Sequence, residues 1–185
     1  MFIETERTPN PATLMFRPGQ RVTTGESADF ASAEAAAAAP LAAALFRLPD
    51  VSRVFMGADF ISITKSGDPE GWTALKPEVL GVLVDHFSGD APVYDAQFQA
   101  GIGASDDPAD AEIILQIREL LETRIRPQVA EDGGDIVYRG FTQGTVYLEM
   151  QGACSGCPSS TATLKLGIEQ LLKYYVPEVT EVRAV

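Results

Sequence analysis

Cysteine and histidine are scarce in this chain, which has 2 Cys and 1 His among 185 residues. Cys154 and Cys157 are three positions apart, so a disulfide between them would close a very small loop and constrain the unfolded chain little. A secreted, disulfide-stabilised domain is therefore not expected. The close spacing of the two sulfurs points to chemistry instead.

Basic residues are also few. The 14 Lys and Arg residues are outnumbered by 26 Asp and Glu residues, which gives a formal net charge of −12. Binding to a nucleic acid depends on clustered Lys and Arg that neutralise phosphates and release counterions. The sequence contains no such cluster, so DNA and RNA are not expected as partners.

Long hydrophobic runs are absent as well. No segment approaches the roughly 20 apolar residues that cross a bilayer, and the run Ala35–Ala39 ends at Pro40. The segment Met1–Glu6 lacks the basic flank and apolar core of a secretory signal and the Arg-rich character of a transit peptide. These absences predict a cytoplasmic protein that does not enter a membrane.

The composition that remains is typical of a globular protein, with 45% apolar and 22% charged residues. Residues 89–110 carry five acidic residues and no Lys or Arg, and they include several Gly and Pro, which is typical of a solvated linker. We therefore expect an α+β protein. It should contain two small mixed α/β domains, residues 1–88 and 109–185, joined by an acidic linker over residues 89–108.

Residues 1–88 show the periodicity of a small mixed domain. Strands are expected at Phe2–Arg7 and Thr13–Arg17, and Val51–Met56 and Phe60–Thr64 should form a hairpin around Gly57-Ala58-Asp59. Helices are expected from Pro40 onward and from Leu75 to Phe87. The domain has no dense group of nucleophile, base and metal ligand. We expect it to bind partners rather than to catalyse a reaction.

Residues 109–185 predict the order helix, hairpin, loop, helix and strand. The first helix should begin after Asp107-Pro108, and Pro127 should kink or end it. Asp132-Gly133-Gly134-Asp135 lacks the ligand pattern of a calcium loop and the Lys of a phosphate loop, so it is expected only to terminate the helix. The hairpin strands are expected at Ile136–Phe141 and Thr145–Met150, on either side of Thr142-Gln143-Gly144, and a last strand at Val179–Val182.

The loop after the predicted hairpin reads Gly152-Ala153-Cys154-Ser155-Gly156-Cys157-Pro158. The two-residue gap lets both sulfurs reach one metal, and Gly156 relieves strain in the tight turn. The amide-rich start of the following helix favours the thiolate form, which is the form that binds metals. Cys154 and Cys157 are therefore the candidate metal ligands and cofactor-binding residues.

One chain does not supply enough ligands for a closed site. Zinc or a cubane cluster held by thiolates needs about four protein ligands, and the chain has two Cys and His86, which is expected at a helix end or on the surface. Two chains paired about a twofold axis supply the missing thiolates. The residues predict a metal centre at a homodimer interface, an arrangement that favours transfer of the metal group over its storage.

Three alternatives stay open at this point. A thioredoxin-like protein also places Cys-x-x-Cys between a strand and a helix, although Gln151–Ala153 lack an aromatic residue and no βαβ unit leads into the motif. Four thiolates suit zinc as well as iron. A non-metal adaptor would recognise partners with its first domain and dimerise through its second.

Two parts of the chain resemble known domains. Residues 111–185, and especially Glu131–Asp135 with Gly152–Ser160, resemble the C-terminal domain of NifU. The segment Thr8–Leu14 resembles the N-terminal domain of Nfu-type proteins. The resemblance covers almost the whole chain.

This resemblance implies an iron-sulfur cluster scaffold or carrier, and not an enzyme. Such a protein binds a [4Fe-4S] cluster between two subunits, here through Cys154 and Cys157, and delivers it to apo iron-sulfur client proteins. The separate assembly and ferredoxin-like domains of longer NifU proteins have no counterpart in this sequence. The resemblance therefore also implies dependence on an upstream cluster assembly system.

Overall fold

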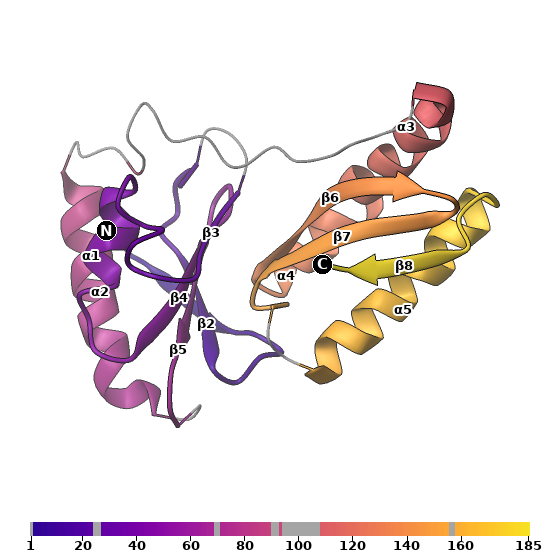
Figure 1. Cartoon of the computed structure of the whole chain (residues 1–185). Helices are drawn as coiled ribbons and strands as arrows, with labels where there is room; N and C mark the ends of the chain where they lie inside the picture. The colour runs from indigo at the N-terminus through magenta and orange to yellow at the C-terminus, as the bar shows by residue number, and fades with distance from the viewer. Residues whose placement is uncertain (1, 24–26, 69–70, 90–92, 94–107, 156–157) are drawn as a thin grey trace. The chain divides into compact units, whose positions relative to one another are not determined.

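The computed structural model describes residues 2–23, 27–68, 71–89, 93, 108–155 and 158–185. The chain divides into two compact units, Met1–Ala100 and Gly101–Val185. Each unit combines helices with a sheet, which confirms the expected α+β class (Figure 1). Most of residues 89–108 falls outside the described residues, so the predicted limits of the linker stay predictions. Among the described residues, no helix is both long enough and apolar enough to span a bilayer.

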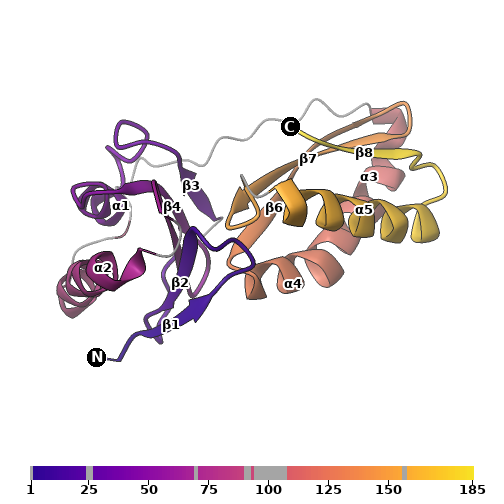
Figure 2. The same cartoon turned by 90° about the horizontal axis from the view of Figure 1, so that it is seen from below.

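The first unit is built on a five-stranded antiparallel sheet with the order β1-β2-β5-β4-β3. Its strands are β1 Glu4–Arg7, β2 Thr13–Arg17, β3 Ala28–Phe30, β4 Val51–Met56 and β5 Ile61–Lys65. The helices α1 (Pro40–Leu45) and α2 (Trp72–Ser88) cover one face of this sheet (Figures 1 and 2). The predicted hairpin is confirmed, with Val54 paired to Ile63.

The strand β3 was not predicted, because it is only three residues long and has a charged residue at its centre. The carboxylate of that residue, Asp29, accepts hydrogen bonds from Arg53 of β4, at 2.8 Å from Nε and 2.6 Å from Nη2. Phe30 on the same strand is buried in the core of the unit. This strand is therefore stabilised by an ion pair with a neighbouring strand and by one buried ring, and local periodicity does not indicate it.

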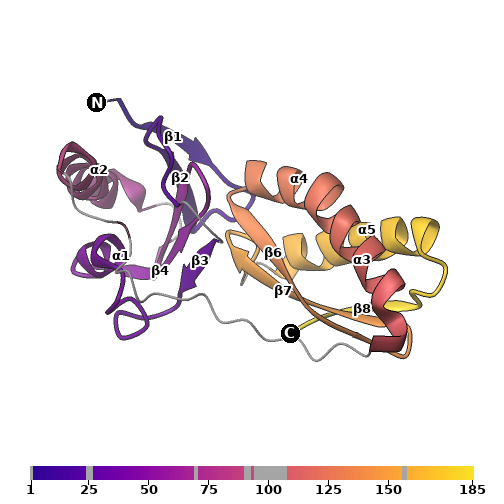
Figure 3. The same ribbon diagram turned by 90° about the horizontal axis from the view of Figure 1, so that it is seen from above.

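The second unit places its helices on one face of a three-stranded sheet (Figures 2 and 3). The helical segment comprises α3 (Ala111–Leu120), a π-helical turn (Leu121–Ile125) and α4 (Arg126–Glu131), and it is followed by β6 Gly134–Thr142, β7 Thr145–Gly152, α5 Pro158–Tyr175 and β8 Glu181–Ala184. Strands β6 and β7 form the predicted antiparallel hairpin, and β8 pairs parallel to β7. The last strand begins two residues later than the predicted Val179.

Pro127 was expected to kink or end the helix, and the helical segment does not end there. The wider π turn before α4 carries the chain onward, and Pro127 occupies the first turn of α4. A proline ring clashes with the carbonyl four residues earlier in a regular α-helix, and a π turn changes that spacing. The helical segment therefore accommodates the proline through a local π turn and continues to Glu131.

Candidate metal centre

The cysteine loop connects the end of β7 to the start of α5. Gly152 ends β7 with a φ of 64°, a left-handed conformation that glycine adopts without strain. The chain then turns, and the Ser155 N–H donates a hydrogen bond to the Gly152 carbonyl at 3.1 Å. The Thr161 hydroxyl, from the first turns of α5, donates to the Cys154 carbonyl at 2.9 Å. The loop is thus held to β7 by a backbone hydrogen bond and to α5 by a side-chain hydrogen bond.

Cys154 is the sequence-predicted ligand that the structure describes. The residue is buried and only 4% exposed. It belongs to the hydrophobic core of the second unit, together with residues such as Ile136 and Leu172. Cys157 lies outside the described residues, so its part in the site stays a prediction.

The underside of the loop is formed by the two glycines that follow α4. The Ala153 N–H donates to the Gly133 carbonyl at 3.1 Å, and Gly134 pairs with Gly152 across the hairpin. A Cβ added to Gly134 would lie 2.7 Å from the Cys154 Sγ and 2.7 Å from the Gln151 carbonyl oxygen. A side chain at residue 134 would therefore displace the sulfur or the strand.

This contact was missed by sequence reasoning. The segment Asp132–Asp135 was predicted to end a helix, and α4 does end at Glu131. The pair of successive glycines was the available signal. Gly133 has a φ of 78°, which explains one of them as the residue that turns the chain. The second glycine is explained by the Cys154 sulfur and the Gln151 carbonyl oxygen, which both lie against it.

The start of β6 is attached to α4 by a charged pair. The Asp135 carboxylate, whose side chain is 8% exposed, accepts hydrogen bonds from Arg126 at 2.8 Å from Nε and 2.6 Å from Nη2. It also accepts the Ile136 N–H at 2.7 Å. Hydrogen bonding to Asp135 raises the pKa of Arg126 above its usual range. This two-pronged pair fixes the glycine segment beneath the cysteine loop.

His86 lies in the last turn of α2 in the first unit, as predicted. Its ring meets Phe87 edge-on with centroids 5.4 Å apart, and its Nε2 is buried without a hydrogen-bond partner in the described structure. Burial lowers the pKa of His86. The cationic form that was expected to favour a helix end is thus disfavoured here.

The described residues hold no complete metal site. No group of three or more His, Cys, Asp or Glu among them is placed to bind a metal ion. Two thiols on one short loop therefore remain the candidate donor set, and they need further ligands from elsewhere. This agrees with the count of cysteines and histidines in the whole sequence.

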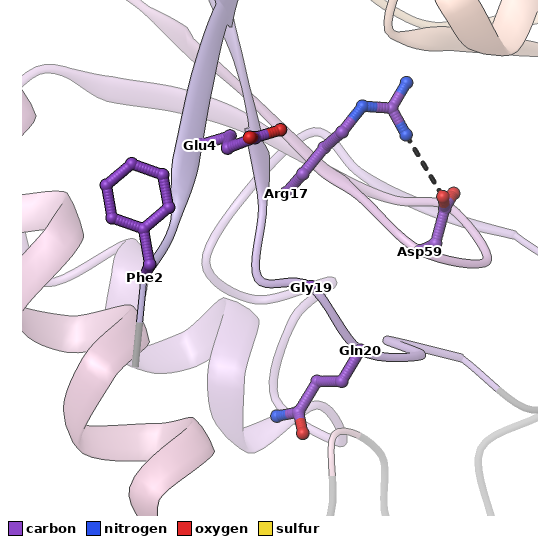
Figure 4. A pocket seen from close by; sticks show the side chains of 6 residues that line it. All are labelled: Phe2, Glu4, Arg17, Gly19, Gln20 and Asp59. Carbon is purple, nitrogen blue, oxygen red and sulfur yellow. Dashed lines mark hydrogen bonds and ion pairs between the residues drawn. The ribbon is translucent and has the colours of Figure 1, made fainter.

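Figure 4 shows a hollow of about 450 Å³ on the first unit. It is lined by Phe2, Glu4, Arg17, Gly19, Gln20 and Asp59. Arg17 donates to the Asp59 carboxylate at 3.1 Å and pairs with Glu6 at 3.4 Å, so the cation of the hollow is already neutralised by neighbouring carboxylates. The predicted binding role of the first domain stays a prediction.

Comparison with known proteins gives matches to both units. The family described as "Scaffold protein Nfu/NifU N terminal" matches residues 3–90. The family described as "NifU-like domain" matches residues 117–183. The two matches follow one another in the order that the sequence resemblance implied.

Several curated relatives match along the whole chain. "NifU-like protein 5, mitochondrial" from Arabidopsis thaliana is 50% identical over 97% of this chain and 66% of the relative. "NFU1 iron-sulfur cluster scaffold homolog, mitochondrial" is 45% identical in Homo sapiens, over 100% of this chain and 72% of the relative. The Drosophila erecta homologue is 49% identical, over 100% of this chain and 65% of its own length. The chain spans about two thirds of the length of these relatives.

The predicted cytoplasmic address is wrong. The matched relatives are named mitochondrial, which points to the mitochondrion instead. The prediction used the composition of Met1–Glu6, but Glu4–Arg7 forms β1 and pairs with β2. Residues 4–6 of that segment are part of a folded sheet, so their composition reflects the fold and not an address.

The resemblance stated from the motifs is thus confirmed by both family matches and by relatives that are 45–50% identical along the chain. The order of an Nfu-type N-terminal domain and a NifU-like domain is common to the matches. The chain belongs to the NifU/Nfu family of iron-sulfur cluster scaffold proteins.

Proposed function

We propose that two copies of this chain bind one [4Fe-4S] cluster through Cys154 and Cys157 of each copy and pass it to apo-proteins. The observation that carries the proposal is the position of the Cys154 side chain. Its sulfur lies at the end of β7, where only a glycine at residue 134 leaves room for it. The names of the relatives, which describe iron-sulfur cluster scaffolds, support the choice of cargo.

The ligand count supports a shared site. A cubane cluster takes about four thiolate ligands, and the chain has 2 Cys in all. A second copy adds two more thiolates with the same geometry. A twofold axis through the cluster makes the two half-sites equivalent, which is the commonest symmetry of soluble oligomers.

Transfer follows from ligand exchange. Thiolates of the recipient protein replace Cys154 and Cys157 on the iron atoms, one iron-sulfur bond forming for each that breaks. The released thiolates take up protons from solvent, and no electron changes hands. Because the ligands come from two separable chains, loss of the dimer contact exposes the cluster to the recipient.

The source and the recipients follow from the same chemistry. In this proposal an upstream assembly system supplies the cluster, as the resemblance to NifU implies. Recipients are apo iron-sulfur proteins whose own cysteines await a cluster. The first unit contributes binding surface for these partners. The protein in this account is a carrier and not an enzyme.

A transfer assay tests the proposal. The wild-type chain is reconstituted under anaerobic conditions and mixed with an apo-enzyme that needs a [4Fe-4S] cluster, and the recovered enzyme activity is measured. The double variant Cys154→Ser, Cys157→Ser should give no recovery above background, while Ser155→Ala, in the same loop, should act like the wild type.

Two results would replace the proposal with a named alternative. Zinc in place of iron in the anaerobically purified dimer would support a structural zinc site. Catalytic reduction of an insulin-like disulfide by the isolated chain would support a thiol-disulfide redox protein. Full recovery of the recipient by the double Ser variant would show that the two cysteines do not carry the cluster.

A further inference from the structure

The helix α5, which follows the cysteine loop, has three distinct faces. Ile168 and Leu172 are buried against the sheet. Lys165, Glu169 and Lys173 are spaced four residues apart along one side, and the Lys173 ammonium pairs with Glu169 at 2.6 Å. All the charged residues of α5 lie in this one row.

The third face, which we name the outer ridge, carries no charge. It consists of Thr163, Leu166, Gly167, Gln170 and Tyr174. With 3.6 residues per turn these positions fall within an arc of about 100°, directly opposite the buried face. Leu166 is 58% exposed and Tyr174 is 80% exposed. Charged side chains are normally found on the side of a helix that is farthest from the core. On α5 the side chains there are apolar or neutral.

Gly167 lies within the outer ridge and is unfavourable for the helix itself. A Cβ added there would meet no atom within 4 Å, so packing inside this chain does not require a glycine. The missing side chain leaves a flat place where a second backbone can approach closely. An alanine at residue 167 would make α5 more stable in the isolated chain.

We propose that the outer ridge of α5 is the surface on which a second copy of this chain docks, with the two α5 helices parallel and in register beside the twofold axis. The inference rests on the proposed function, which requires two copies at one cluster. Thr163 lies about 8 Å along the helix from the start of α5, so the ridge begins next to the cysteine loop. An antiparallel pair would place the two loops at opposite ends of helices about 27 Å long.

Charge supports a second copy over another partner. Each chain has a formal net charge of −12, so two copies repel each other unless they meet at a neutral surface. The outer ridge is such a surface. In the proposed pair each residue of the ridge faces the same residue of the second copy, and no like charges come into contact. A basic partner would be drawn instead to the acidic surface elsewhere on the chain.

The parallel register gives a sharp test, because residue 166 of one copy then lies beside residue 166 of the other. Full-length Leu166→Glu and Leu166→Lys proteins are reconstituted anaerobically, alone and mixed, and their association is measured by analytical ultracentrifugation. Each variant alone should dimerise at least about tenfold more weakly than the wild type, and the mixture should recover. Leu115→Glu, at an equally exposed position on α3, should associate normally.

Gly167→Ala gives a second, independent readout. The variant should raise the thermal unfolding midpoint of the chain, because alanine favours the helix, and it should weaken association. Far-UV circular dichroism of all variants checks that they fold. A variant that gains stability and loses dimer distinguishes an interface from a structural role.

The outcomes separate this inference from the proposed function. If the wild type and both Leu166 variants all form the two-chain cluster species equally well, the ridge is not the interface, although the proposed function stands. If the wild type associates through the ridge but binds no cluster, the inference holds and the proposed function fails. If the wild type stays monomeric under every condition, both are overturned.

Discussion

Gly134 and Cys154 are in direct contact although they are separated by twenty positions in the chain. The sulfur occupies the space that a Cβ on Gly134 would need, at 2.7 Å. The neighbouring Gln151 carbonyl oxygen is equally close to that point. Because one of the two obstacles is backbone, it cannot move aside by rotating about a bond.

Gly134→Ala should therefore impair both the fold and the site. Overpacking at a buried position costs about 1–3 kcal/mol, and the displaced sulfur should lower the amount of cluster bound. We expect reduced iron content after anaerobic reconstitution and a lower unfolding temperature of the second unit. The measurements are iron and sulfide analysis and scanning calorimetry.

A matched glycine provides the control. Gly81 in α2 has no atom within 4 Å of an added Cβ, so Gly81→Ala should leave cluster binding unchanged and stabilise its helix by up to about 1 kcal/mol. If Gly134→Ala bound as much iron as Gly81→Ala, the contact with Cys154 would have no part in positioning the ligand.

The fold was predictable where the information is local. The segment Gly57–Asp59 between two strand-like segments predicted β4 and β5 as a hairpin, and Thr142–Gly144 predicted the turn between β6 and β7. In the structure Gln143 and Gly144 both have positive φ, 49° and 79°, which matches the two-residue turn that fits the twist of a hairpin. The spacing, Gly156 and the following helix entry also predicted Cys154 and Cys157 as ligands, which stays a prediction.

The remaining features depend on contacts between distant residues. Asp29 stays in a strand because Arg53 binds it, and no pattern around Asp29 indicates that partner. From the sequence alone, Gly134 is interpreted as a helix terminator, and its contact with the Cys154 sulfur is known only from the structure. A π turn stands before Pro127 in place of a break in the helix. Leu121 and Ile125 of this turn are buried in the core, and the local sequence does not indicate that packing.

The Arg126–Asp135 pair should stabilise the second unit. Arg126→Met removes two hydrogen bonds from a carboxylate that is 8% exposed, which should cost roughly 1–3 kcal/mol. Calorimetry gives the transition of this unit. Trp72 is the single tryptophan of the chain and lies in α2, so its fluorescence identifies the transition of the first unit.

Lys173→Met is the control for a surface pair. It removes the exposed pair with Glu169, and its effect should stay within about 0.5 kcal/mol. Equal effects of the two substitutions would mean that the buried position of Asp135 adds nothing to the stability of the unit.

His86 should make the stability of the first unit depend on pH. Burial lowers its pKa below the ordinary value of 6.5, so the unfolded chain takes up a proton at a higher pH than the folded chain does. The free energy of unfolding should therefore fall as the pH drops through 6.5 and level off below the folded pKa. Denaturant titrations followed by Trp72 fluorescence measure this.

His86→Phe should abolish that dependence, because the chain has a single histidine. Burial, followed by the adjacent Glu131 carboxylate, raises the pKa of Asp132, which acts in the opposite direction. Asp132 lies in the second unit, so it does not affect the Trp72 signal of the first unit. An unchanged pH profile in His86→Phe would contradict the assignment to His86.

The shared cluster is tested most directly by native mass spectrometry of the full chain after anaerobic reconstitution. The account predicts a species of two chains with one cluster of four irons and four sulfides, and its loss in the Cys154→Ser, Cys157→Ser variant. A single chain that holds a complete cluster without an external thiol, or a dimer that holds only zinc, would contradict it.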